Sequence, residues 1–245
     1  MAGQRGRLYA GTSGLSYPER VPKFYAPGKV SRKLLPAYAA RLPAVELHTT
    51  FYRRPPPEQI EKWLRETPPE FRFCPKSQRG TTWRAWSDPD PGAAFAWLSE
   101  AMRVFGERLG CVLMSLRGSQ ERDDEALARV AAAWPASMPL AIELLHPSWQ
   151  ADEVYRILDQ HSIALVANDW DDREEPDLRR IGPFVYLRLR RTAYAPAEIE
   201  RWARRLEPFL ADGVDAYAFF RHDEDGSMAL NAEALLAAVG SVMES

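Results

Sequence analysis

Charged residues recur inside segments whose composition is otherwise typical of buried β-strands. In AVELHTT, at residues 44–50, Glu46 and His48 alternate with apolar residues. Alternate side chains of a strand face opposite sides, so the charged and the apolar residues lie on different faces. The same alternation in FRFCPK, LAIELL and FVYLRLR predicts one shared interior face for Glu46, His48, Lys76, Glu143, Tyr186, Arg188 and Arg190.

These residue types could carry out acid/base chemistry on an anion. Glu46 and Glu143 come from different strands, and paired carboxylates act as general acid and base when their surroundings separate their pKa values. Lys76 could orient one carboxylate or bind an anionic substrate as a point charge. Arg188 and Arg190 could clamp a carboxylate or phosphate through paired hydrogen bonds.

Further candidate residues come from the ends of the strands and the loops that follow them. Asp169 ends the strand candidate at 163–169, and we expect it at the upper edge of the same interior. The predicted catalytic group is Glu46, Lys76, Glu143, Asp169 and Arg188. The predicted substrate-binding residues are His48, Tyr52, His146, Trp149, Tyr186, Arg190 and His222. The alternative interpretation is a self-satisfied ion network with a structural role, since ion pairs also occur inside folds.

The elements that must position these residues alternate between strands and helices. Strand candidates are 8–13, 44–50, 71–76, 111–116, 140–145, 163–169, 184–190 and 215–221. Amphipathic helix candidates lie near 31–41, 57–66, 91–108, 123–134, 151–160, 196–211 and 229–243. Eight such units in one chain predict a single-domain TIM-like (β/α)8 barrel over 1–245, with the site at the carboxyl ends of its strands.

The sixth unit departs from this pattern. Between the sixth and seventh strand candidates, the charged segment DWDDREEPDLRRIGP and its Pro176 leave little room for an amphipathic helix. The sixth helix is therefore expected to be short or missing. An open doubly wound parallel sheet remains the alternative fold.

Several ordered segments resemble the YecE-like family, a domain family of unknown function with a TIM-like fold. They are GTSGLSYPERVPKFYAP, VELHTTFYRRPP, EFRFCPKSQRGTT, AIELLHPSW, VYLRLRR and FFRHDEDGSMALNA, and they run from about residue 8 to residue 238. The resemblance implies the barrel and brings no established reaction. The residues that it retains include Ser13, Glu46, Tyr52, Lys76, Glu143, His146, Trp149, Asp169, Tyr186 and Arg188.

The departures from the family pattern fall at strand ends. His48 stands where the family has Asn, Leu145 stands where Arg precedes His146, and Arg190 replaces a His. Ser115-Leu116-Arg117-Gly118 replaces Gln-Leu-Pro-Pro, Thr81-Thr82 replaces Thr-His, and Arg221-His222 replaces Asn-Asn. These changes predict a divergent member with a rebuilt pocket or a weakened activity.

Composition and missing motifs exclude several function classes. The net charge of −2 argues against a broad electrostatic grip on nucleic acid. There is no GxGxxG after a strand and no P-loop, so no nucleotide cofactor is expected. The only residues whose types could form a metal site at strand ends are His48, His146 and His222 with Glu143 and Asp169. Their spacing is not diagnostic, so no metal ligand is assigned and a divalent metal stays open. No signal peptide and no apolar run of about 20 residues is present, which predicts a cytoplasmic protein without a membrane partner.

Three functions follow as hypotheses. The first is a hydrolase or lyase that uses acid/base or hydrolytic chemistry on a small anionic carboxylate or phosphate. The second is a non-catalytic ligand-binding or scaffold barrel with a degenerate site. The third is a metal-dependent nucleic-acid phosphodiesterase, against which the acidic segment at 171–177 weighs. No sequence feature sets the oligomeric state.

Overall fold

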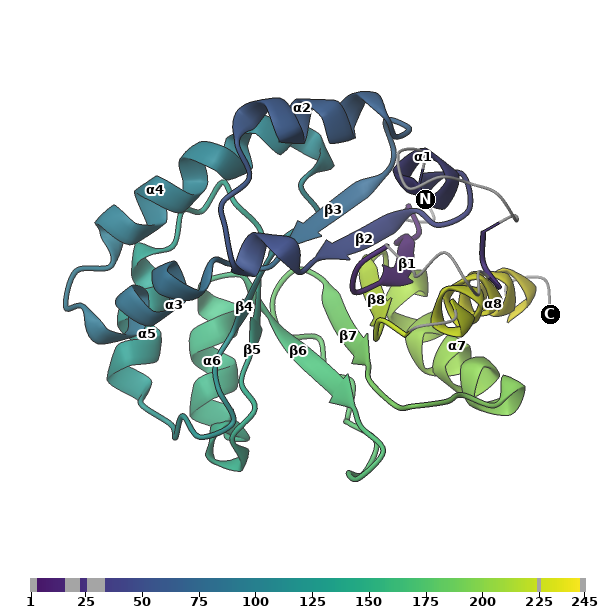
Figure 1. The fold of residues 1–245 in the computed structure, drawn as a ribbon. Helices are drawn as coiled ribbons and strands as arrows, with labels where there is room; N and C mark the ends of the chain where they lie inside the picture. Colours follow the sequence, from purple (N-terminus) through teal and green to yellow (C-terminus); the bar gives the residue numbers. More distant parts are fainter. Residues whose placement is uncertain (1–3, 16–22, 26–33, 224–225, 243–245) are drawn as a thin grey trace.

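Strands and helices alternate along the chain in the computed structural model (Figure 1), which describes residues 4–15, 23–25, 34–223 and 226–242. Every strand pair is parallel. An α/β fold with a parallel sheet is therefore confirmed. The strands are β1 (Leu8–Thr12), β2 (Ala44–Leu47), β3 (Arg72–Pro75), β4 (Val112–Ser115), β5 (Leu140–Glu143), β6 (Ile163–Asp169), β7 (Val185–Leu189) and β8 (Ala216–Phe220).

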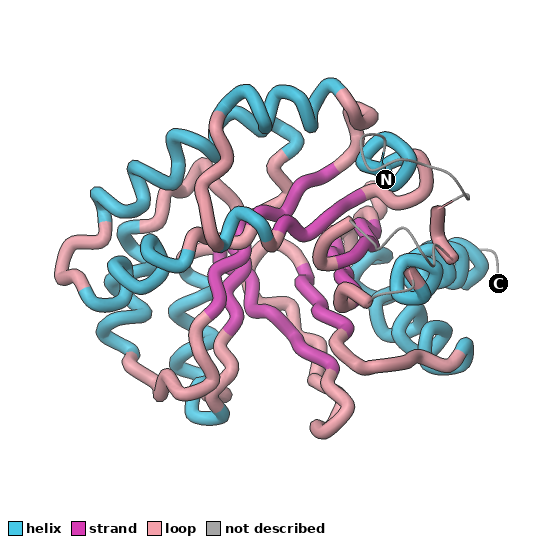
Figure 2. Tube along the Cα trace, in the orientation of Figure 1, coloured by secondary structure: helices cyan, strands magenta, loops and turns pink. Residues whose placement is uncertain are grey.

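The strands form two hydrogen-bonded groups. Six of them make a sheet in the order β1-β8-β7-β6-β5-β4, and β2 pairs with β3. Isolated bridges join the groups on both sides, between Ser13 and Glu46 and between Lys76 and Leu113. Figure 2 shows the strands gathered in the centre with helices around them.

The helices begin and end largely where local chemistry allows. Pro57 and Pro196 occupy the first turns of their helices, where a missing backbone N–H costs little. Asp123 caps its helix by accepting from the backbone N–H of Ala126. None of the helices in the described ranges is long and apolar enough to cross a membrane. The helices are α1 (Leu34–Ala39), α2 (Pro57–Arg65), α3 (Arg79–Ser87), α4 (Gly92–Met102), α5 (Asp124–Ala133), α6 (Asp152–Gln160), α7 (Pro196–Ala211) and α8 (Ser227–Val242).

The structure differs from the predicted elements in three places. The helix expected over 91–108 breaks into α4 and the 3-10 helix η3 (Arg103–Arg108), which contains Gly106 at φ 55°. Helix α3 was not expected, because its sequence RGTTWRAWS lacks a clear apolar stripe. The helix expected over 31–41 is seen as α1, and residues 31–33 lie outside the described part.

No helix connects β6 to β7 across residues 170–184, all of which the structure describes. This confirms the expectation drawn from the charged segment and Pro176. An irregular loop without a helix joins the two strands there (Figure 1).

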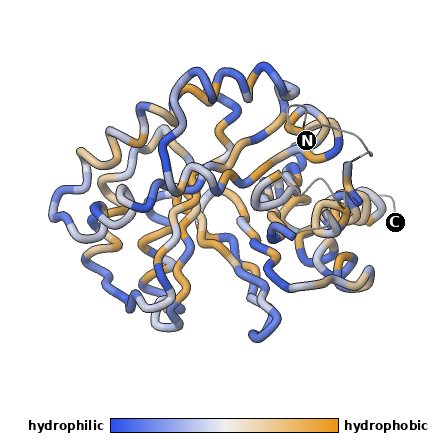
Figure 3. The backbone as a smooth tube through the Cα atoms, viewed as in Figure 1, coloured by the Kyte–Doolittle hydropathy of each residue, from blue (hydrophilic) through white to orange (hydrophobic). Residues whose placement is uncertain are grey.

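Apolar residues pack on both faces of the strands. The larger core lies between strands and helices, and Figure 3 shows its apolar character in the orange central segments. A smaller cluster lies on the other face of the strands, and each of the eight strands contributes at least one residue to it. Cys74 and Cys111 belong to this inner cluster, with their sulfur atoms 3.8 Å apart. Burial of both faces explains the nearly continuous apolar runs in the strands.

Candidate functional site

Glu46 is the centre of a buried cluster on the inner face of the strands. Its side chain is 0% exposed. Oε1 accepts hydrogen bonds from Ser13 Oγ at 2.6 Å, His48 Nε2 at 2.5 Å and Arg188 Nη2 at 2.9 Å. Oε2 accepts one from the hydroxyl of Tyr186 at 2.7 Å. Four donors therefore engage both oxygens of this carboxylate, which suits it to hold other side chains in place.

Arg188 joins Glu46 to the second inner carboxylate. Its Nη1 donates to Oε1 of Glu143 at 2.5 Å, and the two side chains are only 3% and 2% exposed. Burial opposes charge on Arg188, but Glu46 and Glu143 outweigh it and raise the pKa of Arg188 above its ordinary value. Burial likewise opposes charge on Glu46, but Arg188, His48 and Ser13 hold the pKa of Glu46 well below its usual range. Glu46 and Arg188 are thus held in their charged forms, and Arg188 links the two carboxylates.

Strand register explains why residues far apart in sequence meet here. Glu143 is paired with Ser115 on the neighbouring strand, and Arg188 is paired with Asn168. Each of these residues lies at or near the carboxyl end of its strand, so the polar side chains form a layer above the inner apolar cluster.

Lys76 lies in the same layer and has no polar partner among the described residues. It follows β3 directly, is partly buried, and makes no side-chain hydrogen bond or ion pair with any residue that the structure describes. Its Nζ lies 5.0 Å from the centroid of the Phe51 ring. Burial and the nearby Arg188 charge lower the pKa of Lys76, against the opposing influence of Glu143 and Glu46.

Several hydrogen-bonding atoms in this layer are unused within the described chain. Arg190 donates from Nη1 to Ser13 Oγ at 2.9 Å, but its buried Nε has no partner. The buried Nε of Arg188, Oγ of Ser115 and Oδ1 of Asn168 are also without partners. Unpaired buried polar atoms are uncommon and mark a place where a ligand or water can bind.

We call Glu46, Lys76, Glu143, Arg188 and Arg190 the inner charged cluster. It holds two carboxylates and three cationic side chains, so its fixed charge is positive by one. One oxygen of Glu143, Oε2, makes no hydrogen bond with a described residue. The cluster can therefore accept an anion while keeping one carboxylate oxygen free for proton transfer.

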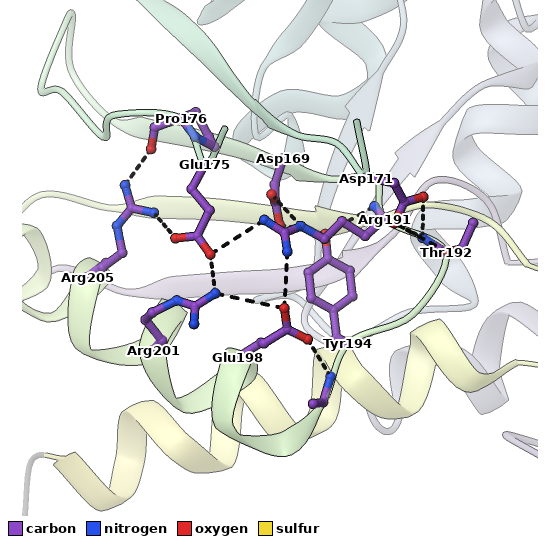
Figure 4. Close-up of polar contacts among 11 residues, drawn as sticks. Asp169, Asp171, Glu175, Pro176, Arg191, Thr192, Tyr194, Glu198, Arg201 and Arg205 are labelled. Carbon is purple, nitrogen blue, oxygen red and sulfur yellow. Dashed lines mark hydrogen bonds and ion pairs between the residues drawn. The ribbon is translucent and has the colours of Figure 1, made fainter. Parts of the chain in front are cut away.

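The structure does not bring Asp169 to this cluster. Its buried carboxylate accepts from Arg191 Nε at 2.7 Å and from the hydroxyl of Tyr194 at 2.9 Å (Figure 4). The reason is strand alternation: Val166 lies in the inner apolar cluster, so Asn168 shares its face and Asp169 has the opposite one. The sequence expectation overlooked this parity, which would have identified Asn168 instead.

Asp169 belongs to a second ion network on the outer side, between the 170–184 loop and α7 (Figure 4). Arg191 donates to Glu198 at 3.1 Å, and Arg205 donates to Glu175 at 3.1 Å. Arg201 also pairs with Glu175. We call Asp169, Glu175, Glu198, Arg191, Arg201 and Arg205 the outer network. Its contacts fasten the long loop to α7.

Two predicted binding residues instead stabilise the loop after β5. Trp149 is 1% exposed, donates from Nε1 to the carbonyl of Gln120 at 2.8 Å and packs edge-on against Trp86. His146 accepts from the backbone N–H of Ser148 at 3.3 Å and lines a side cavity of about 370 Å³. Burial of Trp149 removes it from the candidate substrate surface.

The other predicted binding residues divide between the cluster and its surroundings. His48, Tyr186 and Arg190 are brought to Glu46 or its partners, as described above. His222 lies with Ser13 and His48 along a pocket of about 470 Å³. Tyr52 is 77% exposed. Sequence reasoning left Ser13 out of the site, although Ser13 is retained in the family resemblance and follows β1 directly.

The proposed metal constellation is not assembled in the described part of the chain. His48 contacts Glu46, whereas His146 and Asp169 lie with other partners. No group of three or more His, Cys, Asp or Glu side chains in the described residues could hold a metal ion.

Comparison with known proteins gives related folds. A DUF72 family protein from Thermotoga maritima MSB8 is 24% identical, with a TM-score of 0.76 over 98% of this chain and 100% of that chain. A DUF72 family protein from Enterococcus faecalis V583 is 20% identical, with a TM-score of 0.70 over 99% of both chains. D-psicose 3-epimerase from Clostridium cellulolyticum H10 is a more distant, TIM-barrel-like neighbour, at 10% identity and a TM-score of 0.51 over 97% of each chain.

Sequence comparison agrees with these fold relationships. The UPF0759 protein YunF of Bacillus subtilis (strain 168) is 37% identical over 75 residues, which is 31% of this chain and 26% of YunF. The aligned part is thus about a quarter of that relative. The family model described as "Protein of unknown function DUF72" matches residues 9–245. The chain therefore belongs to the DUF72 family.

Proposed function

We propose that this protein is an enzyme that binds a small anionic substrate at the inner charged cluster and acts on it by acid/base chemistry. Within the family, we propose a divergent YecE-like member whose eight strands close into a (β/α)8 barrel. The bridges between the two strand groups and the inner apolar cluster drawn from all eight strands support closure. The cluster then lies at the carboxyl ends of the barrel strands, where barrel enzymes carry their active sites.

One observation carries the proposal. The cluster contains one carboxylate whose two oxygens are both hydrogen-bonded, and also a carboxylate and an amine that keep hydrogen-bonding capacity unused among the described residues. Glu46 accepts four hydrogen bonds, whereas Glu143 keeps Oε2 free and Lys76 has no polar partner in the described chain. An ion network built only for stability would pair its charges. A lysine without an ion pair, in the same cluster as a carboxylate with a free oxygen, favours binding of an anion and proton transfer to it.

The roles follow from this division. Glu46 positions Arg188, His48 and Tyr186, since it contacts all three. Lys76 and Arg190 attract the anionic group of the substrate. Glu143 exchanges a proton with the substrate through its free oxygen. Arg188 holds Glu143 in place through its hydrogen bond to Oε1.

Binding of small anions tests the proposal without knowledge of the natural substrate. Isothermal titration calorimetry with phosphate, citrate and glyoxylate is expected to show binding of at least one probe to the unaltered protein. Lys76→Met should weaken that binding by about tenfold or more, equivalent to 1.4 kcal/mol. Asp169→Asn, in the outer network, should leave it unchanged.

Two results would overturn the proposal. One is absence of binding by all three anions at low ionic strength. The other is equal loss of affinity in Lys76→Met and Asp169→Asn, which would place the binding site outside the inner charged cluster. Product analysis after long incubation with the bound anion then separates an enzyme from a binding protein.

A further inference from the structure

We propose that Lys76 is a nucleophile that forms an imine with the carbonyl carbon of a small oxo acid. This inference rests on the proposed anion site, because the acid group of the substrate would be held by Arg190, which stays charged when Lys76 is neutral and whose buried Nε has no partner among the described residues. It goes further in naming the substrate class, a carboxylate that also carries an aldehyde or ketone, and a covalent step.

The surroundings of Lys76 distinguish it from other described lysines. Lys62 pairs with Glu66 at 3.9 Å on the exposed face of α2, and Lys23 donates to Ser227. Lys76 has no such partner within the described residues, and the Phe51 ring covers one side of its amine. An amine at the carboxyl end of an inner strand, which interacts electrostatically with a carboxylate that has a free oxygen, has the arrangement that imine formation needs.

The charges that face Lys76 favour its reactive form. Burial and Arg188 lower the pKa of Lys76, and only Glu143 and Glu46 act in the opposite direction. Glu46 is itself engaged by four donors, including Arg188. A larger share of neutral amine is therefore present near neutral pH than for an exposed lysine.

The step balances with the groups at hand. The neutral Nζ of Lys76 forms a bond to the carbonyl carbon while the carbon–oxygen π bond breaks. One amine proton passes through the free oxygen of Glu143 to the substrate oxygen, giving a carbinolamine. The second amine proton reaches the same oxygen, the carbon–oxygen bond breaks, and water leaves as the carbon–nitrogen double bond forms. Neither an oxidant nor a reductant is consumed.

Reductive trapping with glyoxylate tests the inference. Glyoxylate is a small anionic aldehyde, and cyanoborohydride reduces an imine to a stable amine that peptide mass spectrometry locates. The chain has five lysines, Lys23, Lys29, Lys33, Lys62 and Lys76, so the modified position is readily assigned. We expect Lys76 to be modified about tenfold faster than Lys62, because burial and Arg188 lower the pKa of Lys76 and the cluster holds the acid group of glyoxylate near its amine.

Two matched variants test whether Lys76 acts as a nucleophile or only as a positive charge. Lys76→Arg keeps the cation but has no amine to form an imine, so it should lose trapping at this position and still bind phosphate more tightly than Lys76→Met does. Lys62→Arg should leave trapping at Lys76 unchanged. If Lys76→Arg fails to fold, Glu143→Gln supplies the test, since loss of proton transfer should slow trapping about tenfold.

The outcomes distinguish this inference from the proposed function. Anion binding that depends on Lys76, with trapping at Lys76 no faster than at Lys62, would overturn the imine and leave the anion site standing. Absence of anion binding would overturn the proposed function, and the imine with it. Trapping that is fast at Lys76 and competed by phosphate supports both.

Discussion

The molecule contains two sets of charges, each including a buried carboxylate, that differ in how completely they are paired. In the outer network, three carboxylates face three arginines, and Asp169 accepts from both Arg191 and Tyr194 (Figure 4). In the inner charged cluster, two carboxylates face three cations, and Lys76 has no polar partner among the described residues. Balanced pairing fastens a loop to a helix, whereas incomplete pairing leaves charge available for a ligand. Burial alone therefore does not tell a structural network from a candidate site.

The largest expected effect comes from removing the cation that joins both inner carboxylates. Arg188→Met leaves Glu46 and Glu143 buried without their shared partner. Breaking a buried ion pair by removing one member typically costs about 3–5 kcal/mol. We expect a loss of that size in the free energy of unfolding, measured by urea denaturation at neutral pH.

A double variant sharpens this prediction. The double variant Arg188→Met, Glu143→Gln also removes one of the two carboxylates that lost their partner. Part of the lost free energy of unfolding should therefore be regained. Equal stability of the single and double variants would contradict an energetic link between Arg188 and Glu143.

Removing one charge from the outer network should cost less stability than removing Arg188 from the inner charged cluster. Asp169→Asn keeps a side chain of the same shape but removes the charge that Arg191 and Tyr194 contact. Loss of hydrogen bonds to a charged group costs about 1.5–3 kcal/mol. We expect urea denaturation to show a loss in this range, with no change in anion affinity. A change in affinity would show that the two sets of charges are coupled.

A smaller effect appears in acid and concerns Glu46. Its folded-state pKa is depressed, chiefly by Arg188 and the bonds from His48 and Ser13 against the effect of burial. Between that value and the ordinary glutamate pKa of about 4.3, the unfolded chain binds more protons than the folded one. Stability contributed by Glu46 is thus complete above about pH 4.3 and is lost as the pH falls toward the depressed folded value.

The carboxyl carbon signal of Glu46 in an NMR titration checks this assignment. It should remain that of a carboxylate through the range where free glutamate titrates. A Glu46 signal that titrates at the ordinary value would contradict the hydrogen-bonded, ionised state described here.

Strand alternation explains how much of this could be predicted from the sequence. It correctly brought Glu46, Glu143 and Arg188 together, as the contacts of Arg188 with both carboxylates confirm. Their catalytic role stays a prediction. The same rule, applied to the end of β6, would have selected Asn168 and set Asp169 aside.

Loop residues were less predictable because no periodicity constrains them. Trp149 follows a strand and is aromatic, which is typical of a substrate surface, yet the loop turns its indole inward to Gln120. The four hydrogen bonds that Glu46 accepts could not be predicted from the sequence either. They depend on the side-chain positions of Ser13, which follows β1, and of Tyr186 and Arg188, which both lie on β7.

The smallest expected change in stability tests the comparison of the two charge sets most directly, because it concerns Lys76, which has no polar partner among the described residues. Lys76→Met removes a partly buried charge that makes no ion pair within the described chain, and it relieves repulsion with Arg188. We therefore expect the free energy of unfolding to change by no more than about 0.5 kcal/mol, the range of substitutions away from structural features. Arg191→Met, which removes a partner of Asp169, should cost several times more. A large loss of stability in Lys76→Met would mean that Lys76 supports the fold, and the unequal pairing of the two charge sets would no longer indicate a binding site.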